Sequence, residues 1–522
     1  MEITFLGHAG FFVETDETIL IMDPWLSSSG AFDGGWFQFP KNHHLANVVK
    51  ERLLKNLHKR AIIYISHEHK DHFDEKFLRT LEDCDFEYVL PKFRRTVLID
   101  KIKSFSNKKI FLCNDDSTIF LNNNESIKIY IEDSEINRDS AILFESKNEK
   151  FLNLNDCKIH DRLKHIKDSE IQIDYFAVQF SGATWHPTCY NYSKEEYEKI
   201  SLKKKMSKFQ ATKIAIEMIN PKVYIPSAGP ACFLDPDIIH LNFEKNNIFP
   251  RSEEVVEFLK NHLKNKEILI PEIAPGDVLC LTKDEIFILS DNHRVNEKNF
   301  QEYIISYAKE YEHFFNEIKK PLKAIEFELM LEDLKSELEL KLKSFKSKSG
   351  LSRSLYLGFL DKLNCYIKID FAANKIDYVD EINEENFYLL NAYSYDINRV
   401  LKGFLTWEDF ALTFRVKLNR EPDVYQSLMQ GFMILEKEDL NFFCDKILEI
   451  ENRTERIIIE VAGCKYSIDR YCPHQGADLK HAWSEGDRFL VCPRHRWSFD
   501  LLKDGSCEGN SASINAIPLE NE

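Results

Sequence analysis

The chain has 522 residues, of which 43% are hydrophobic and 30% are charged, and its formal net charge is −17. This length exceeds what one hydrophobic core supports, so two or three domains are expected. The acidic charge argues against a nucleic-acid partner, because phosphate binding needs a basic surface. No apolar run approaches the roughly 20 residues that span a bilayer, and no export signal precedes the strand-like residues 3–6. A cytoplasmic enzyme is therefore expected.

Residues 1–295 alternate between short strands and helices, which predicts a layered α/β domain. The predicted strands are residues 3–6, 19–22, 61–66, 127–131, 141–144, 151–154 and 223–225. The predicted helices are residues 46–57, 75–81 and 194–218.

From residue 296 the composition shifts to Glu, Lys, Leu and Phe, and residues 296–437 are predicted to form an intermediate α+β domain. Its expected helices are residues 301–319, 405–418 and 423–434. Its expected strands, which alternate with a period of two, are residues 325–329, 338–342 and 366–371. Residues 438–522 read as short strands and turns, which predicts a small all-β domain.

The C-terminal segment contains a C-x-H motif and, after seventeen residues, a C-x-x-H motif. The four residues are Cys472, His474, Cys492 and His495. Two thiolates suit one iron and two imidazoles suit the other iron of a Rieske [2Fe-2S] cluster, and the neutral nitrogen donors raise its reduction potential. A structural zinc site would also use two cysteines and two histidines, but with different spacings. The motif therefore predicts a Rieske domain that relays electrons.

A second motif, H-x-H-x-D-H, follows the predicted strand 61–66 and resembles the metal-binding signature of the metallo-β-lactamase superfamily. Residues 6–11 and 21–25 resemble the opening hairpin of that superfamily. Residues 151–156 resemble the strand that delivers its metal-bridging aspartate, which would be Asp156. The resemblance implies an αββα sandwich for residues 1–295.

The sequence departs from the superfamily's zinc hydrolases because no histidine lies between His72 and Asp156, and none lies in the turn at residues 224–229. The residues that remain as catalytic and metal-binding candidates are His67, His69, Asp71, His72 and Asp156. Two histidines and a carboxylate are enough for a mononuclear non-haem iron with open positions, and zinc is the alternative metal.

Four further side chains have two interpretations each. His8 is either a ligand or orienting group, or a packed hairpin histidine. Asp133 or Asp139 either replaces the missing histidine or lies in a surface loop. His186 is either a substrate contact or a structural residue.

Together these motifs resemble one family, the CMP-N-acetylneuraminate hydroxylases, which are Rieske iron–sulfur monooxygenases. In the animal hydroxylases the Rieske domain comes first, whereas here it is last. Further segments that carry the resemblance are residues 23–26, 30–36, 63–67, 180–183, 407–409 and 420–425.

The resemblance implies an oxygen-dependent monooxygenase that hydroxylates a small molecule such as a CMP-linked sialic acid. An external reductase, a ferredoxin or a b-type cytochrome would reduce the cluster, which passes single electrons to the metal of the first domain. One alternative is a zinc-dependent hydrolase with an appended redox domain, which predicts turnover without oxygen. Another is an electron-transfer protein with a degenerate first domain, in which His67 and His69 are dispensable.

Overall fold

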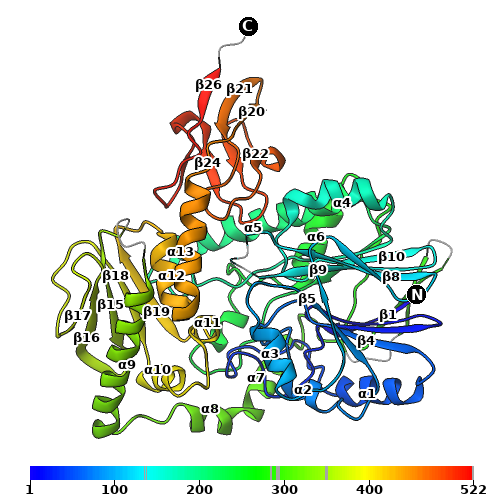
Figure 1. Cartoon of the computed structure of the whole chain (residues 1–522), viewed down its shortest axis with the longest axis horizontal. Coiled ribbons are helices and arrows are strands. Elements are labelled where there is room, and N and C mark those ends of the chain that lie inside the picture. Colours follow the sequence, from blue (N-terminus) through cyan, green and yellow to red (C-terminus); the bar gives the residue numbers. More distant parts are fainter. Residues whose placement is uncertain (135, 137, 283–284, 290–293, 347–350, 520–522) are drawn as a thin grey trace. The chain divides into compact units, whose positions relative to one another are not determined.

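The computed structural model describes residues 1–134, 136, 138–282, 285–289, 294–346 and 351–519. The chain divides into two compact units (Figure 1). The first unit consists of Met1–Ala183 with Ser201–Lys309, and the second consists of Thr184–Ile200 with Glu310–Glu522. The division into three domains with boundaries near residues 295 and 437 stays a prediction.

The first unit contains two sheets that pack face to face. The larger sheet has the order β14-β13-β1-β2-β3-β4-β5-β6, with β1 Glu2–Gly7, β2 Gly10–Glu14, β3 Thr18–Met22, β4 Arg60–Tyr64, β5 Glu87–Pro91, β6 Ile110–Cys113, β13 Val278–Thr282 and β14 Glu285–Leu289. The smaller sheet has the order β12-β11-β10-β9-β8-β7, with β7 Ser117–Phe120, β8 Glu125–Ile131, β9 Ser140–Ser146, β10 Glu149–Asn153, β11 Tyr175–Gln179 and β12 Val223–Ser227.

Helices cover the outer face of each sheet, which makes the αββα sandwich that the sequence predicts. The helices packed on the larger sheet are α1 Leu45–Lys55, α2 Glu75–Arg79 and α3 Val97–Lys103. Those packed on the smaller sheet are α4 Leu163–Glu170, α5 Lys194–Ile219 and α6 Ser252–His262. All seven strands and three helices predicted within residues 1–295 are present, with ends that differ by at most two residues.

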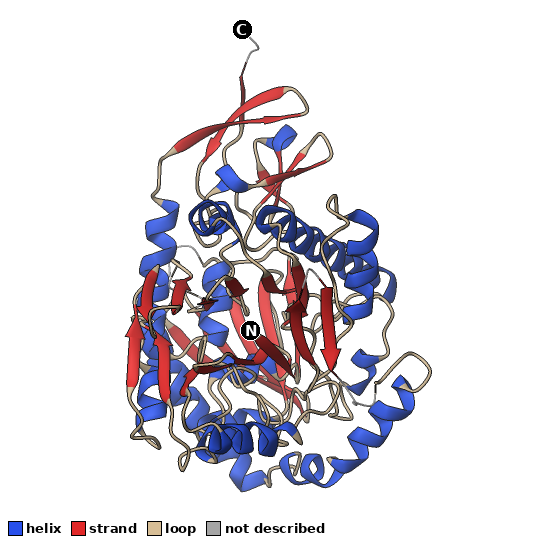
Figure 2. Cartoon of the chain, turned by 90° about the vertical axis from the view of Figure 1, so that its right-hand side faces the viewer, coloured by secondary structure: helices blue, strands red, loops and turns tan. Residues whose placement is uncertain are grey.

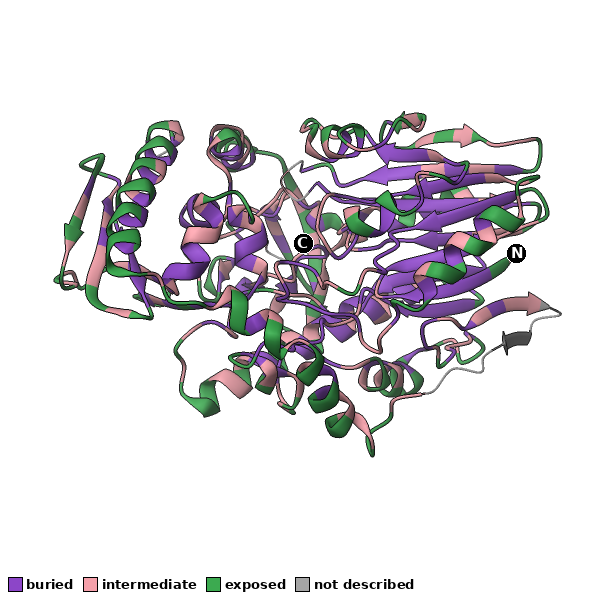
Figure 3. Ribbon diagram, turned by 90° about the horizontal axis from the view of Figure 1, so that it is seen from below, coloured by how far each residue is buried: buried purple, intermediate pink, exposed green. Residues whose placement is uncertain are grey.

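Alternation along the strands separates the cores of the sandwich. In β2, Phe11 and Val13 face the space between the sheets, whereas Phe12 faces the helices on the outside. The ring of Phe11 meets Phe151 of β10 edge to face, with centroids 5.1 Å apart, and both side chains are fully buried. Figure 3 shows these strands as the buried part of the unit. This contact joins the two sheets whose ends carry the candidate site.

The second unit contains a five-stranded sheet with the order β17-β16-β15-β18-β19 and two small sheets, β20-β21-β26 and β22-β23-β24-β25 (Figure 2). The five-stranded sheet consists of β15 Ser354–Phe359, β16 Lys362–Asp370, β17 Lys375–Val379, β18 Phe387–Ala392 and β19 Val416–Glu421. The small sheets consist of β20 Arg456–Val461, β21 Cys464–Asp469, β22 Trp483–Glu485, β23 Phe489–Val491, β24 Ser498–Asp500, β25 Ser506–Cys507 and β26 Ile517–Leu519.

The remaining helices lie in the second half of the chain. They are α7 Phe300–Glu310, α8 Glu312–Ile318, α9 Ala324–Ser344, α10 Ser394–Leu401, α11 Trp407–Leu412, α12 Ser427–Ile434 and α13 Lys437–Glu451. No helix within the described ranges is long and apolar enough to cross a lipid bilayer.

The strands predicted at residues 325–329 and 338–342 are wrong, because both segments belong to the helix α9. The buried side chains of α9 recur at helical spacing: Phe327, Met330, Leu331, Leu334, Leu338, Lys341 and Leu342. The other apolar residues that created a period of two, Ile325, Leu329 and Leu340, are 76%, 59% and 45% exposed. The helix predicted at residues 405–418 is also wrong in its second half, which enters β19.

We expect Phe151→Ala to destabilise the sandwich by about 3–5 kcal/mol, because it leaves a cavity between the two sheets. Hydrogen exchange of peptides from β2 and β10 measures this opening free energy separately from the second unit. Phe120→Ala is the matched control, since Phe120 lies in the same sheet but is 77% exposed. It should change stability by less than about 0.5 kcal/mol. Equal effects of the two substitutions would contradict this assignment of the core.

Candidate functional site

The predicted metal-binding residues lie at the carboxyl ends of parallel strands in the first unit. Strand β4 runs parallel to β3, and β10, β11 and β12 are mutually parallel. Residues 66–72 form the loop after β4, Asp23 follows β3, and Asp156 follows β10. His8 lies in the turn between β1 and β2, close to Asp23 because Phe11 pairs with Met22. Side chains at these ends converge on one edge of the sandwich.

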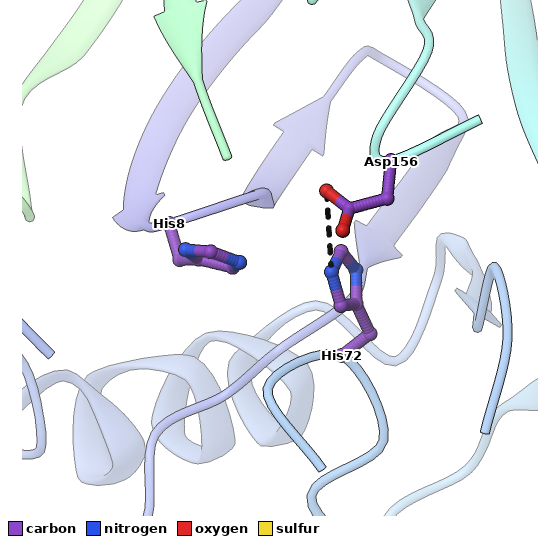
Figure 4. Close-up of side chains that lie close together, drawn as sticks. All are labelled: His8, His72 and Asp156. Atoms are coloured by element: carbon purple, nitrogen blue, oxygen red, sulfur yellow. Dashed lines mark ion pairs between the residues drawn. The ribbon is translucent and has the colours of Figure 1, made fainter. Parts of the chain in front are cut away.

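Three of these side chains form a candidate metal centre. The ligand atoms of His8, His72 and Asp156 all lie within 4.8 Å of one another (Figure 4). His72 Nε2 lies 3.8 Å from both Asp156 Oδ1 and Asp71 Oδ2, and His8 Nε2 lies 3.1 Å from Asp71 Oδ2. Two ligands bound to one metal at about 2.1 Å lie roughly 3–3.5 Å apart, so the 3.1 Å separation fits a shared ion and the 3.8 Å separations are slightly wider than that spacing.

The orientation of His72 is set by Asp23. Asp23 Oδ2 lies 2.7 Å from His72 Nδ1, which places Nε2 toward His8 and Asp156. Asp23 also accepts hydrogen bonds from the backbone N–H of Ser66 at 2.7 Å and from its hydroxyl at 2.5 Å. A carboxylate behind a histidine fixes the tautomer and raises the basicity of a ligand to metal. The sequence motif did not single out this role of Asp23.

The electrostatics of the pocket favour a cation. Burial opposes the charged form of His72, but the carboxylates of Asp71, Asp23 and Asp156 outweigh it and raise the pKa of His72 to about 10. Burial works against the charged form of Asp71 as well, yet His72 and His8 hold the pKa of Asp71 well below its usual range. Neither His8 Nε2 nor His72 Nε2 makes a well-aligned hydrogen bond within the described part of the chain. A metal ion bound at these nitrogens would supply the favoured positive charge.

His67 and His69 lie beside this group but outside it. His67 Nε2 is 2.9 Å from His69 Nδ1, and the rings of His67 and His72 have centroids 4.3 Å apart. His67 Nδ1 lies 3.5 Å from Asp139 Oδ1, and burial raises the pKa of Asp139 to about 7. Of the two aspartates considered as substitutes for the missing histidine, Asp139 is thus buried next to His67, whereas Asp133 is exposed.

His8 lies next to the last turn, in which the sequence has no histidine. The turn after β12 carries Ser227 and Ala228, and the N–H of Ala228 donates to the carbonyl of His8 at 2.9 Å. His8 has a φ of +49°, which is uncommon for a residue other than glycine. Strained backbone conformations cluster at functional sites. Of the two interpretations of His8, its position among the ligand candidates favours a ligand or orienting group over a packed hairpin histidine.

Asp156 is oriented by a buried pair that sequence reasoning missed. Gln179, the last residue of β11, donates from Nε2 to Asp156 Oδ1 at 2.7 Å. Lys208 of α5 donates to Gln179 Oε1 at 2.8 Å, and its side chain is almost fully buried. Because an ammonium group only donates, Lys208 fixes which end of the Gln179 amide faces the carboxylate. Neither residue belongs to a recognisable motif, so only the fold reveals the pair.

The C-terminal motifs form two loops with the same backbone pattern. The N–H of Cys472 donates to the carbonyl of Ala477, and the N–H of Cys492 donates to the carbonyl of Trp497 in the same way. The fifth residues of the two loops, Gly476 and Arg496, both have a left-handed conformation, with φ of +71° and +61°. The matched loops present the two half-motifs to each other, as the sequence predicts for a cluster held from two sides.

The side chains of these loops fit an iron–sulfur cluster. Cys472 and Cys492 are buried, whereas His474 and His495 are half-buried with ring centroids 4.6 Å apart. Burial, together with the adjacent Cys492, raises the pKa of the Cys472 thiol well above its usual value. Two thiols held side by side away from water suit a cluster iron, which binds them as thiolates.

Comparison with known families agrees with both sites. The family profile of the Rieske [2Fe-2S] domain matches residues 431–518, and that of the β-lactamase superfamily domain matches residues 2–137. The chain combines a Rieske domain with a β-lactamase-fold domain. The Rieske domain is therefore the part of the chain that holds the 2Fe-2S cluster, and the β-lactamase-fold domain carries histidine and carboxylate ligands that suit non-haem iron or zinc.

Relatives extend over most of the chain. A Rieske 2Fe-2S iron–sulfur protein of Mycobacterium tuberculosis is 25% identical over 525 residues, which cover 97% of this chain and 98% of that protein. The cytidine monophosphate-N-acetylneuraminic acid hydroxylase of Pongo pygmaeus is 22% identical over 451 residues, covering 82% of this chain and 71% of that enzyme. Among solved structures, a diiron β-hydroxylase from Streptomyces venezuelae is 14% identical, with a TM-score of 0.35 over 55% of this chain and 54% of that one.

His186 belongs to the second unit, and its Nε2 lies 2.9 Å from the hydroxyl of Tyr192. Its contact with substrate stays a prediction.

We expect Asp23→Asn to weaken metal binding at the first site by about 10–100-fold, because an amide cannot accept from both Ser66 and His72 as the carboxylate does. Competition with a coloured chelator measures the affinity. Asp16→Asn is the matched control, since the side chain of Asp16 is 80% exposed on a hairpin of the same sheet. Unchanged affinity in Asp23→Asn, with a correctly folded protein, would show that this carboxylate does not support a metal ligand.

Proposed function

We propose that the protein is a Rieske-linked, metal-dependent oxygenase. The observation that carries the proposal is the cluster of His8, His72 and Asp156 in a chain that also contains a Rieske domain. Two histidines and one carboxylate leave coordination positions open, which is the ligand set of non-haem iron oxygenases. When bound, the iron supplies the place where dioxygen is reduced, and the 2Fe-2S cluster supplies electrons one at a time.

The residues around the first site have distinct roles in this proposal. His8, His72 and Asp156 hold the metal, with Asp71 as a fourth ligand, and His67 and His69 lie beside them. Asp23 keeps His72 Nε2 directed into the site, and Gln179 orients the Asp156 carboxylate. The contact of Asp23 is buried and that of Gln179 is partly buried, so both hold the ligand geometry before substrate arrives.

The overall reaction that we propose converts a C–H bond of the substrate into C–OH. One atom of dioxygen enters the product, and the other leaves as water with two electrons and two protons. The electrons come from an external donor through the Rieske domain, since a pyridine nucleotide transfers them in pairs. A ferredoxin, a flavin-containing reductase or a b-type cytochrome has the required chemistry.

The twelve cysteines form no disulfide, which favours a reducing compartment such as the cytoplasm.

The substrate class that we propose is an N-acylated sugar nucleotide, CMP-N-acetylneuraminate being the reference compound. The support is the similarity to enzymes named cytidine monophosphate-N-acetylneuraminic acid hydroxylase, which covers 82% of this chain at 22% identity. At this identity the substrate can differ while the reaction class is retained.

The proposal predicts about three irons and two acid-labile sulfides per chain in anaerobically purified protein, with a Rieske-type EPR signal after reduction. His72→Ala and Asp156→Ala should lose the iron of the first site and oxygen consumption while the EPR signal remains. Cys492→Ser should lose the cluster signal while the first site still binds metal. About two irons with zinc at the first site, and turnover without oxygen, would replace the proposal with a zinc-dependent hydrolase.

Substrate is tested with CMP-N-acetylneuraminate, dioxygen and a reducing system, followed by mass spectrometry. A mass increase of about 16 Da that becomes about 18 Da with isotopically heavy dioxygen is the expected result. The matched control is Asp156→Ala, which should give no product. Reductant-dependent oxygen consumption without a modified sugar would retain the oxygenase and reject this substrate class.

A further inference from the structure

The histidine end of the Rieske cluster site borders a loop outside the residues that match the Rieske family. Residues 422–426 join β19 to α12, and Tyr425 of this loop reaches side chains of both cluster loops. The ring centroid of Tyr425 lies 6.2 Å from His474 and 5.8 Å from Trp497, with ring planes at 79° and 87°. These are favourable edge-to-face contacts.

Tyr425 contacts a stack of rings that includes one predicted cluster ligand. The imidazole of His474 lies flat on Trp497, with centroids 4.4 Å apart and planes at 14°. His474 also meets His495 edge to face, with centroids 4.6 Å apart. The rings of Trp497, His495 and Tyr425 therefore restrict the rotation of His474 about its side-chain bonds. Of these three rings, only that of Tyr425 lies outside the cluster loops.

The backbone of Tyr425 is also attached to the cluster domain. Its N–H donates to the carbonyl of Gly509 at 2.9 Å, and Tyr425 forms an isolated parallel bridge with Asn510. The ring is thus held in register with the cluster loops by a main-chain contact.

A buried arginine anchors the opposite side of the loop. Asp423 accepts from Arg420 Nε at 2.6 Å and from the hydroxyl of Tyr192 at 2.7 Å. Arg420 is 6% exposed and lies over the ring of Tyr190 at 4.8 Å, so it has no room to adopt another position. A charge-assisted hydrogen bond to such a residue is among the stronger ones in proteins.

A second arginine holds the carbonyl groups of the loop. Arg353 donates to the carbonyl of Pro422 at 2.8 Å and lies over the ring of Tyr388 at 5.3 Å. The hydroxyl of Tyr388 donates to the carbonyl of Val424 at 2.6 Å. Pro422 and Val424, on either side of Asp423, are therefore each held by a side chain of the five-stranded sheet or of the segment leading into it.

We propose that Tyr425 is a positioning residue for the Rieske cluster, presented by the intermediate segment 296–437 to fix His474 and to keep water from one side of it. This proposal goes beyond the oxygenase reaction and depends only on the Rieske domain. With two thiolate ligands the oxidised cluster is neutral and the reduced cluster carries a negative charge, so solvent exposure favours reduction. Shielding by Tyr425 therefore lowers the reduction potential.

The test is an EPR-monitored redox titration of the full-length, cluster-loaded protein at constant pH. Tyr425→Ala should raise the reduction potential and shift the g-values of the reduced cluster, because water replaces the ring and His474 gains freedom. Tyr425→Phe keeps the ring and should restore both properties to those of the unmodified protein. A Tyr425→Ala variant with unchanged potential and g-values would overturn the proposal.

Two further variants keep the test decisive. Asp423→Asn retains the Tyr425 ring but weakens its anchor, so it should shift the potential in the same direction by a smaller amount. If Tyr425→Ala fails to assemble the cluster, Asp423→Asn takes its place in the test. An unchanged potential in Asp423→Asn would then overturn the proposal. Tyr378→Ala is the matched control, because Tyr378 lies in β17 at the opposite edge of the same sheet from β19. A shift of equal size in this control would also overturn it.

Discussion

The buried carboxylate of Asp23 is the interaction on which the first site depends. Asp23 directly follows β3, and its carboxylate accepts two hydrogen bonds from Ser66 in the loop after β4 and sets the orientation of His72. One side chain thus joins two neighbouring parallel strands and the loop that carries the ligand candidates. Asp23 itself has a left-handed backbone, with a φ of +41°. The hydrogen bonds of the carboxylate offset this strain, which costs on the order of 1–2 kcal/mol.

The candidate site retains a metal-binding geometry although its sequence lacks two histidines of related hydrolases. His8 supplies an imidazole from a neighbouring hairpin, and Asp139 supplies a carboxylate beside His67. Both residues are close in space to the H-x-H-x-D-H loop but distant from it in sequence.

The sequence predicts the sandwich and both motifs well because these depend on local patterns. Alternating strands, the H-x-H-x-D-H loop and the two cysteine–histidine pairs are all visible within short windows. His8 could be named only as one of two interpretations, since its role depends on the turn after β12. Gln179 and Lys208 could not be found, because their contact joins a strand end to a distant helix. The strands predicted within α9 fail for a different reason: a period of two over five residues also occurs on a helix with exposed leucine and isoleucine.

The connectivity of the chain bears on how the two ligand sets are linked. After β11, which ends in the Gln179 that orients Asp156, the chain leaves the first unit at Ala183 and returns to it at Ser201. The intervening residues 184–200 belong to the second unit, where Tyr192 donates to Asp423 in the loop that carries Tyr425. The chain therefore runs from Gln179 directly to Tyr192, which is hydrogen-bonded to the loop that carries Tyr425.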